Sequence, residues 1–241
     1  MTEPGDKIQE LESKLAELEQ LDEIKTQFVS LASHELRTPI SVVHGISQTL
    51  YLRGHQLSDE QLAELRRTLF EQSCRLAELT DQLLDMSRLD AQAYAVNPER
   101  FNPRERILQL LNRIAPDRRD EIDVGVESSL EVVTDPHAFE RVIGNLLTNA
   151  LRYGAPPIEV RTSWDDVVDV IVEDHGPGVP DEFVPLLFER FSQAGGRRGQ
   201  GAGLGLAIAK SFAEALGGDL RYEPATPSGA RFHFELPREV A

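Results

Sequence analysis

A histidine followed directly by an acidic residue, His34 and Glu35, lies in a segment with strong helical periodicity. On a helix, Thr38 and Ser41 fall within about 40° of His34, whereas most apolar neighbours centre on the opposite side. His34 is therefore predicted to point to solvent. A neutral imidazole is a competent nucleophile near neutral pH, and an adjacent carboxylate can keep its other nitrogen protonated. The alternative is an exposed histidine without a function.

Pro39 follows one turn after Glu35 and has no N–H to donate to the Glu35 carbonyl. A bend of the helix just after His34 is expected for that reason. A zinc-protease motif is excluded, because Thr38 stands where the second histidine ligand would be needed.

Two asparagines, Asn145 and Asn149, are spaced four residues apart in a second helical segment. They share one helix face, so both amide oxygens can reach a hard cation such as Mg²⁺. Taken alone, a pair of asparagines on a helix is more often structural.

Asp174 directly follows a buried-looking strand at residues 167–173 and precedes Gly176 and Gly178. A carboxylate in this position can accept a hydrogen bond from the exocyclic amine of adenine, while the glycines let the backbone approach the ring. On its own the segment is an ordinary turn.

The glycine-rich run at residues 199–207 has neither the spacing of a Rossmann fingerprint nor that of a Walker loop. Its backbone amides lead into a helix N-terminus, which favours triphosphate oxygens. The alternative is a flexible glycine linker.

Residues 33–39, Ser-His-Glu-Leu-Arg-Thr-Pro, resemble the phosphoacceptor box of two-component sensor histidine kinases. The asparagine, aspartate and glycine clusters resemble the ATP-binding boxes of histidine kinases, type II topoisomerases, a mismatch-repair ATPase and a heat-shock chaperone. Together the resemblance covers residues 24–237. It implies that His34 attacks the γ-phosphate of ATP, that Glu35 orients the imidazole or takes its proton, and that Thr38 serves phosphatase chemistry.

The resemblance also implies Mg²⁺ coordination by the two asparagines, a phosphate contact from Arg152 and packing of Tyr153 on the adenine. Lids of this family usually carry an arginine where this chain has Gln193, so Arg197 and Arg198 are its expected substitutes. His175 replaces the more frequent asparagine. The residues expected to bind ATP or Mg²⁺ are Asn145, Asn149, Arg152, Tyr153, Asp174, Gly176, Gly178, Phe188, Phe191, Arg197, Arg198, Gly201, Gly203, Leu204, Gly205 and Leu206.

Residues 7–52 are predicted to form one long helix that starts as a coiled coil with a stutter. After a turn at residues 53–57, the pair Ser58 and Gln61 indicates a capping box at the start of a second helix, which runs to about residue 92. A two-helix hairpin cannot enclose its own apolar stripe, so a dimeric four-helix bundle is expected.

Residues 95–103, which contain two prolines, are the expected hinge to a second domain. Helices are predicted at residues 103–114, 136–153 and 203–216, and strands at 122–127, 131–134, 158–162, 167–173, 220–222 and 230–236. The predicted fold class is α+β: a helical hairpin at residues 1–97, followed at residues 98–241 by an α/β sandwich of the GHKL (Bergerat) ATPase type.

The formal net charge is -16, which disfavours binding to nucleic acid or to anionic lipid. The single cysteine, Cys74, excludes an intramolecular disulfide, and no apolar stretch is long enough to span a membrane. A cytoplasmic protein is therefore expected.

The sequence predicts a homodimeric protein-histidine kinase that uses ATP and Mg²⁺ and passes the phosphoryl group to the receiver domain of a cognate response regulator. It leaves open an upstream sensor module or sensor protein, and autophosphorylation within or between subunits. Two rivals are a silent dimeric scaffold that binds ATP only as a structural ligand, and a related ATPase without phosphohistidine.

Overall fold

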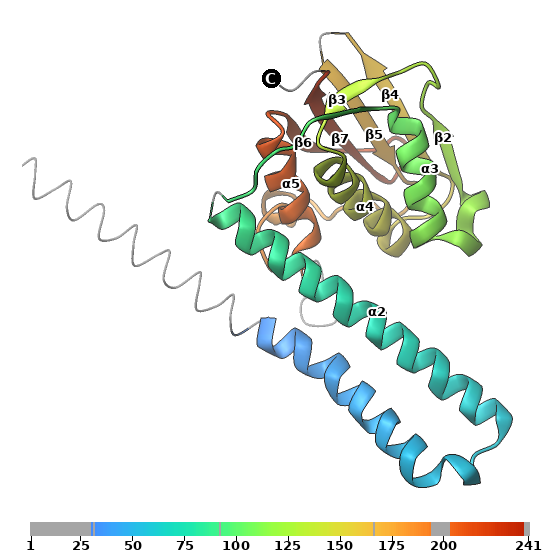
Figure 1. The fold of residues 1–241 in the computed structure, drawn as a ribbon. Helices are drawn as coiled ribbons and strands as arrows, with labels where there is room; N and C mark the ends of the chain where they lie inside the picture. Colours follow the sequence, from blue (N-terminus) through green and yellow to red (C-terminus); the bar gives the residue numbers. More distant parts are fainter. Residues whose placement is uncertain (1–29, 31, 92, 166, 194–202, 239–241) are drawn as a thin grey trace, which may run out of the picture. The chain divides into compact units, whose positions relative to one another are not determined.

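The computed structural model describes residues 30, 32–91, 93–165, 167–193 and 203–238 (Figure 1). The chain separates into two compact units between Leu83 and Leu84, within a long helix. The predicted coiled coil over residues 7–29 lies outside the described residues. A functional boundary at residues 97 and 98 stays a prediction.

The first unit is a helical hairpin. Residues 32–53 are helical on both sides of Pro39, a short 3-10 turn η1 (Gly54–Gln56) follows, and helix α2 (Asp59–Asp90) runs back alongside (Figure 1). The predicted capping box is confirmed: the Ser58 N–H donates to the Gln61 side-chain oxygen at 2.9 Å, and the Gln61 N–H donates to Ser58 Oγ at 3.3 Å. The expected turn and the start of the second helix are therefore correct.

The second unit is built on a five-stranded sheet in the order β2-β4-β5-β7-β6. Its strands are β2 (Ile122–Gly125), β4 (Ile158–Trp164), β5 (Val167–Glu173), β6 (Asp219–Pro224) and β7 (Ala230–Pro237). Only β2 and β4 pair in parallel among them; the other neighbours are antiparallel. The α+β prediction is confirmed, and β5 has the predicted bounds.

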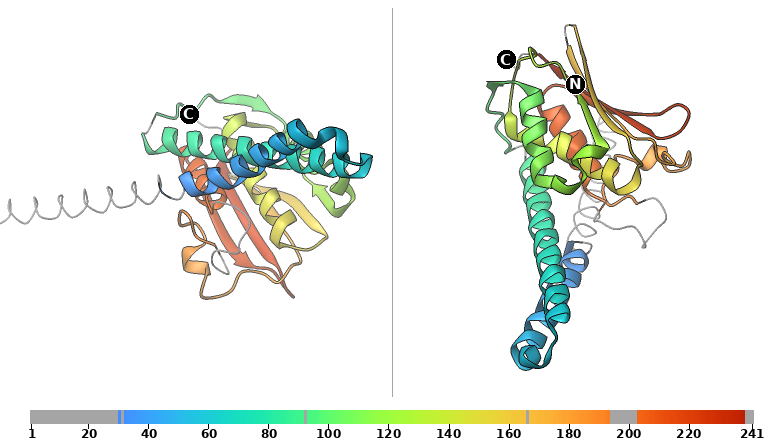
Figure 2. Two further views of the ribbon diagram at one scale, coloured as in Figure 1. Left: turned by 90° about the horizontal axis from the view of Figure 1, so that it is seen from below. Right: turned by 90° about the vertical axis from the view of Figure 1, so that its right-hand side faces the viewer.

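Helices α3 (Pro103–Ile114), α4 (Pro136–Tyr153) and α5 (Gly205–Ala215) cover one face of this sheet, as the edge-on view in Figure 2 shows. Alternate residues of each strand point to the sheet face beneath these helices, and those residues are apolar. Val170 and Phe234, for example, are fully buried there. Helices α3 and α4 have the predicted bounds. Each begins at a proline, and the residue before it, Asn102 or Asp135, caps the helix with its side chain.

Helix α5 ends as expected at two glycines. The Gly217 N–H donates to Glu214 O and the Gly218 N–H to Ala213 O, while Gly217 has φ 75°. This pair of bonds is the Schellman motif, in which glycine adopts a left-handed conformation at little cost.

Residues 95–103, the expected hinge, contain an element that the sequence did not predict. Strand β1 (Glu99–Phe101) lies within this segment and pairs antiparallel with β3 (Val132–Thr134). The ring of Phe101 meets Phe139 edge-on, with centroids 5.3 Å apart. A strand of three residues is too short to show an alternating pattern, so only the pairing with the distant β3 defines β1.

Candidate functional site

The histidine of the hairpin is exposed, as predicted. Its side chain is 75% accessible, and Thr38 and Ser41 are also exposed. Glu35 is three-quarters buried, and its Oε1 lies 3.8 Å from His34 Nδ1. The other ring nitrogen, Nε2, does not face the carboxylate. The predicted polar stripe exists in the described residues.

Asp174 lies where β5 ends, with only 4% of its surface exposed. The Gly176 N–H donates to its Oδ1 at 2.8 Å. Burial raises the pKa of the Asp174 carboxyl above its ordinary value, although this hydrogen bond acts in the opposite direction. A buried carboxylate with one oxygen engaged can use the other to accept an N–H donor.

Glycine is required around this carboxylate. A Cβ on Gly154 would lie 2.4 Å from Asp174 Cγ, and one on Gly176 would lie 2.7 Å from Gly154 Cα. On the other side, a Cβ on Gly229 would meet Asp174 O at 1.8 Å. Sequence analysis identified Gly176 but missed Gly154 and Gly229, because their importance comes from proximity to a residue distant in the sequence.

Gly178 and His175 hold the turn after Asp174. Gly178 has φ 75°, and a Cβ on it would approach Gly229 O to 2.9 Å. His175 Nδ1 lies 2.8 Å from Pro157 O, and since a carbonyl oxygen only accepts, this nitrogen carries the proton. The ring of His175 therefore anchors the start of β4.

The first asparagine of the predicted metal pair meets the start of α5. Asn145 Nδ2 donates to Arg141 O at 2.9 Å, so its amide oxygen is the free end of the group. A Cβ on Gly205 would lie 2.9 Å from that oxygen. The structure thus brings the asparagine cluster and the glycine-rich cluster together. Asn149 follows one turn later on α4.

The loop between Phe191 and Gly201 is the expected lid, and its first residue, Phe191, is joined to Gly203, which follows it. The Phe191 N–H donates to Gly203 O at 2.8 Å, and both residues have φ 65°. A Cβ on Gly203 would lie 2.8 Å from Ser192 O, so glycine is needed there. Arg197, Arg198 and Gly201 lie outside the described residues.

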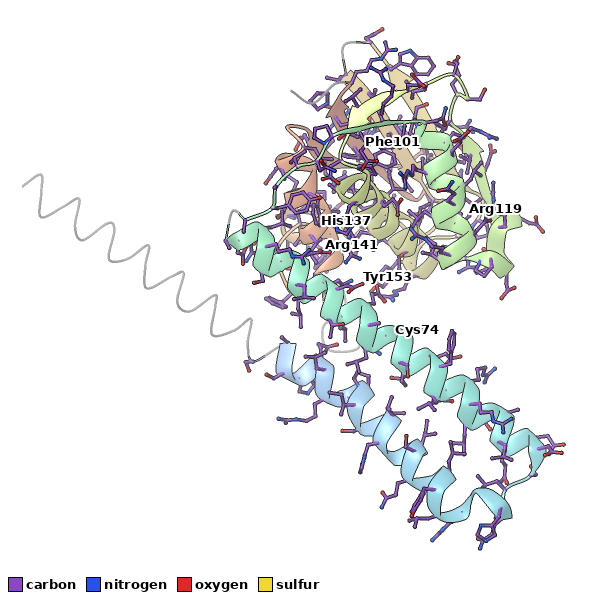
Figure 3. The ribbon with its side chains drawn as sticks, in the orientation of Figure 1. Cys74, Phe101, Arg119, His137, Arg141 and Tyr153 are labelled. Atoms are coloured by element: carbon purple, nitrogen blue, oxygen red, sulfur yellow. The ribbon has the colours of Figure 1, made fainter. Side chains whose placement is uncertain are left out.

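Other residues of the predicted set divide by burial. Phe188 packs edge-on against Phe232, with Lys210 Nζ 5.8 Å from its ring centroid, and Leu204 is 1% exposed. These two side chains pack in the domain. Leu206 is half-buried, and Arg152, in the last turn of α4, is exposed. Tyr153, in the same turn, is also exposed (Figure 3).

The N-terminus of α4 is held by Asp135, which sequence analysis missed. Its carboxylate accepts the N–H groups of His137, Ala138 and Asn97 at 2.8, 3.0 and 2.8 Å. Burial alone would raise the pKa of Asp135, but these donors and the Tyr94 hydroxyl hold it below its ordinary value. One carboxylate therefore joins the start of the asparagine-bearing helix to the segment before β1.

The last turns of α2 belong to the second unit and pack onto it. Asp85 is 4% exposed, and Met86 is completely buried. Asp85 Oδ2 lies 2.6 Å from Nε of Arg141, which comes from α4 (Figure 3). Near the helix end, Asp90 Oδ2 accepts from Arg190 Nη1 at 2.9 Å. Nothing in the local sequence distinguishes these carboxylates from the many exposed ones on α2.

The fold and the site together define a protein with an exposed histidine on a helical hairpin and an α/β unit in which glycines pack closely around a buried aspartate. Residues 24–92 match the family described as His Kinase A (phospho-acceptor) domain. Residues 134–240 match the family described as Histidine kinase-, DNA gyrase B-, and HSP90-like ATPase. The chain belongs to the sensor histidine kinases of two-component systems.

Relatives and solved structures agree. The signal transduction histidine-protein kinase AfsQ2 of Streptomyces coelicolor is 30% identical over 95% of this chain and 45% of its own length. The Mycobacterial sensor histidine kinase MprB is 32% identical, with a TM-score of 0.52 over 60% of this chain and all of that structure. Histidine kinase AdeS of Acinetobacter baumannii, 26% identical, gives 0.67 over 85% of this chain and 98% of that one. The chain spans less than half the length of its curated relative.

In the part of the chain that the structure describes, no helix combines the length and apolar character needed to cross a membrane. Nor do three His, Cys, Asp or Glu side chains gather within the described ranges to hold a metal ion.

Proposed function

We propose that this chain is an ATP-dependent protein-histidine kinase core that phosphorylates its own His34 and transfers the phosphoryl group to an aspartate of a response regulator. The observation that carries the proposal is the exposed imidazole of His34 beside the three-quarters-buried Glu35, in the segment matched by the phosphoacceptor family. A solvent-exposed nucleophile can be reached by a nucleotide held on another domain and then by a partner protein.

The geometry supports Nε2 as the attacking atom. Glu35 faces Nδ1, and a small rotation that shortens the 3.8 Å separation lets the carboxylate accept the Nδ1 proton. The lone pair of Nε2 forms the bond to the γ-phosphorus, the bond between that phosphorus and the bridging oxygen breaks, and ADP leaves. The catalytic contribution is positioning and charge stabilisation.

ATP is the proposed phosphoryl donor, with its adenine amine on the Asp174 carboxylate. Asp174 is buried among glycines that keep side chains away from it, a shape suited to a flat ring. Arg152 would contact phosphate, and Tyr153 would pack on the adenine. The backbone of Phe191, Gly203 and Gly205 would line the nucleotide site, together with the lid residues Arg197 and Arg198.

Mg²⁺ is the proposed cofactor, held by Asn145 and Asn149. The free amide oxygen of Asn145 is the kind of ligand this ion prefers, and the described residues offer no dedicated carboxylate cage. The remaining ligands would be phosphate oxygens and water. Bound there, the ion neutralises charge on the phosphates.

A homodimer is the proposed assembly. The hairpin exposes large apolar side chains, including Tyr51 at 88% and Phe70 at 70%. Two such hairpins can cover these side chains in a four-helix bundle. A receiver domain is the proposed acceptor, and the cytoplasm, where ATP is supplied, is the proposed location.

The test is incubation of the chain with Mg²⁺ and γ-labelled ATP. A phosphohistidine gives a label on the protein that is stable in base and lost in acid. A protein that binds ATP without labelling would be the structural scaffold, and ATP hydrolysis without a protein-bound label would indicate a related ATPase. Transfer of the label to purified receiver domains tests the second half of the proposal.

A further inference from the structure

A cation from the second helix of the hairpin contacts the residue beside the proposed nucleophile. Nη2 of Arg75, on α2, lies 3.4 Å from Oε2 of Glu35 and donates to it. The two residues are 40 positions apart, so this contact exists only because the helices run back alongside one another. Both side chains are partly buried, at 35% and 25% exposure.

The two oxygens of the Glu35 carboxylate have different neighbours. Oε1 faces His34 Nδ1 at 3.8 Å, and Oε2 faces Arg75. Because the guanidinium occupies one oxygen, it does not compete with the imidazole for the other. Holding one end of a carboxylate also limits its rotation, so the second oxygen stays directed toward the histidine.

An ordinary ion pair that joins two helices is the simpler interpretation of such a contact. A surface ion pair contributes little to stability, about 0 to 1 kcal/mol. The Arg75–Glu35 pair differs from a surface pair in that one member is three-quarters buried and touches the proposed nucleophile. Burying most of a carboxylate is costly unless it has a charged or hydrogen-bonding partner, and Arg75 supplies one.

We propose that Arg75 is a positioning residue for the phosphorylation of His34, acting through Glu35. The inference rests on the proposed function. Arg75 fixes the carboxylate, the carboxylate fixes the Nδ1–H tautomer, and the Nε2 lone pair of His34 is thereby presented to the γ-phosphate. Arg75 itself touches neither the nucleotide nor the reacting atoms.

The test is the rate of autophosphorylation of the full chain with saturating Mg-ATP. Arg75→Gln should lower kcat about tenfold, the lower end of the loss seen when an outer-shell partner is removed. KM for ATP should be unchanged, because the nucleotide site lies in the other unit. Arg75→Lys, which keeps a cation, should recover most of the rate.

Arg67→Met is the matched control. Arg67 lies on the same helix and pairs with Glu71 at 3.7 Å, but it is 73% exposed and does not contact Glu35. Its kcat should equal that of the unaltered chain. In a Glu35→Gln background, Arg75→Gln should have no further effect, since its action passes through that carboxylate.

A second readout does not depend on activity. In ¹⁵N spectra of His34, the unaltered chain should show mainly the Nδ1–H tautomer, and Arg75→Gln should show a mixture. The proposal is overturned if Arg75→Gln keeps both the rate and the tautomer, or if its effect adds fully to that of Glu35→Gln. Light scattering and thermal melting establish that each variant is dimeric and folded. If Arg75→Gln is not, Arg75→Met, the same substitution as in the Arg67→Met control, decides by the same rate and spectrum: a rate and tautomer equal to those of the control overturn the proposal.

Failure of this inference is distinct from failure of the proposed function. If the unaltered chain carries no label that depends on His34, the kinase proposal itself is wrong. If the chain is labelled on His34 while Arg75→Gln behaves like Arg67→Met, only the role of Arg75 is wrong.

Discussion

Around His34 the hairpin leaves three-quarters of the side chain accessible, whereas Asp174 keeps only 4% of its surface exposed. A Cβ on Gly45, on the His34 helix, would have no atom within 4 Å, but a Cβ on Gly154 would overlap Asp174. The exposed imidazole suits the proposed phosphoryl acceptor, and the close packing around Asp174 suits the proposed adenine contact. Substitutions in the two regions should therefore have different consequences.

The largest expected effect is that of His34→Gln, which should abolish the phosphohistidine label completely. ATP affinity, measured by calorimetry, should be nearly unchanged, since the side chain is exposed and lies in the other unit from the nucleotide site. Labelling that persists would place the acceptor elsewhere, and a loss of ATP affinity would mean that the two regions are not separable.

Thr38 lies one turn beyond His34 on the same exposed face. Thr38→Ala should slow dephosphorylation of the response regulator about 10²-fold, as expected when a positioned catalytic group is lost, while autophosphorylation stays within several-fold. Both rates are measured on one preparation. An equal loss of both would point to a structural role before Pro39, and no loss of either would exclude phosphatase chemistry through this hydroxyl.

Asp174→Asn should weaken ATP binding about tenfold, the effect of replacing a hydrogen bond to a charged group by a neutral one. Burial raises the pKa of Asp174, so protonation, which removes the negative charge of the acceptor, occurs at a higher pH than for an ordinary aspartate. Affinity of the unaltered chain should therefore fall on acidification before that of the variant does. Identical pH profiles in calorimetry would show that adenine does not use this carboxylate.

The remaining expected effects are on stability, and they separate the two regions most directly. Gly154→Ala should destabilise the second unit by about 1–3 kcal/mol, because the added methyl overlaps Asp174 Cγ and Ala150 O. Gly45→Ala, in an open part of a helix, should instead be neutral or stabilise by about 0.5–1 kcal/mol. Urea unfolding of each variant measures both; equal effects would remove the contrast.

Sequence patterns predicted the elements whose signals are local. Helices α3 and α4 were bounded correctly because a capping residue and a proline mark each start, and β5 because its apolar run ends at a turn. Strand β1 was missed because its three residues are defined by a partner strand far along the chain. The same limit applies to Gly154, Asp135 and Arg75, whose importance comes from a contact and not from a neighbouring residue.

The site residues follow the same division. His34 was recognised as exposed from helical geometry alone, and the structure bears this out. The approach of Gly205 to Asn145 could not be derived from spacing, since it depends on how two helices pack. The roles of these residues in binding ATP and Mg²⁺ stay predictions.

The last turns of α2 pack within the second unit, so the stability of a fragment depends on whether it includes them. Excision of the ATP-binding part at residue 98 would remove Met86, which is fully buried, and the Asp85 carboxylate that pairs with Arg141. The vacated space alone would cost about 2–5 kcal/mol, a large fraction of a domain's total stability. A fragment that begins at residue 84 keeps both side chains, so we expect it to be more stable than a fragment that begins at residue 98.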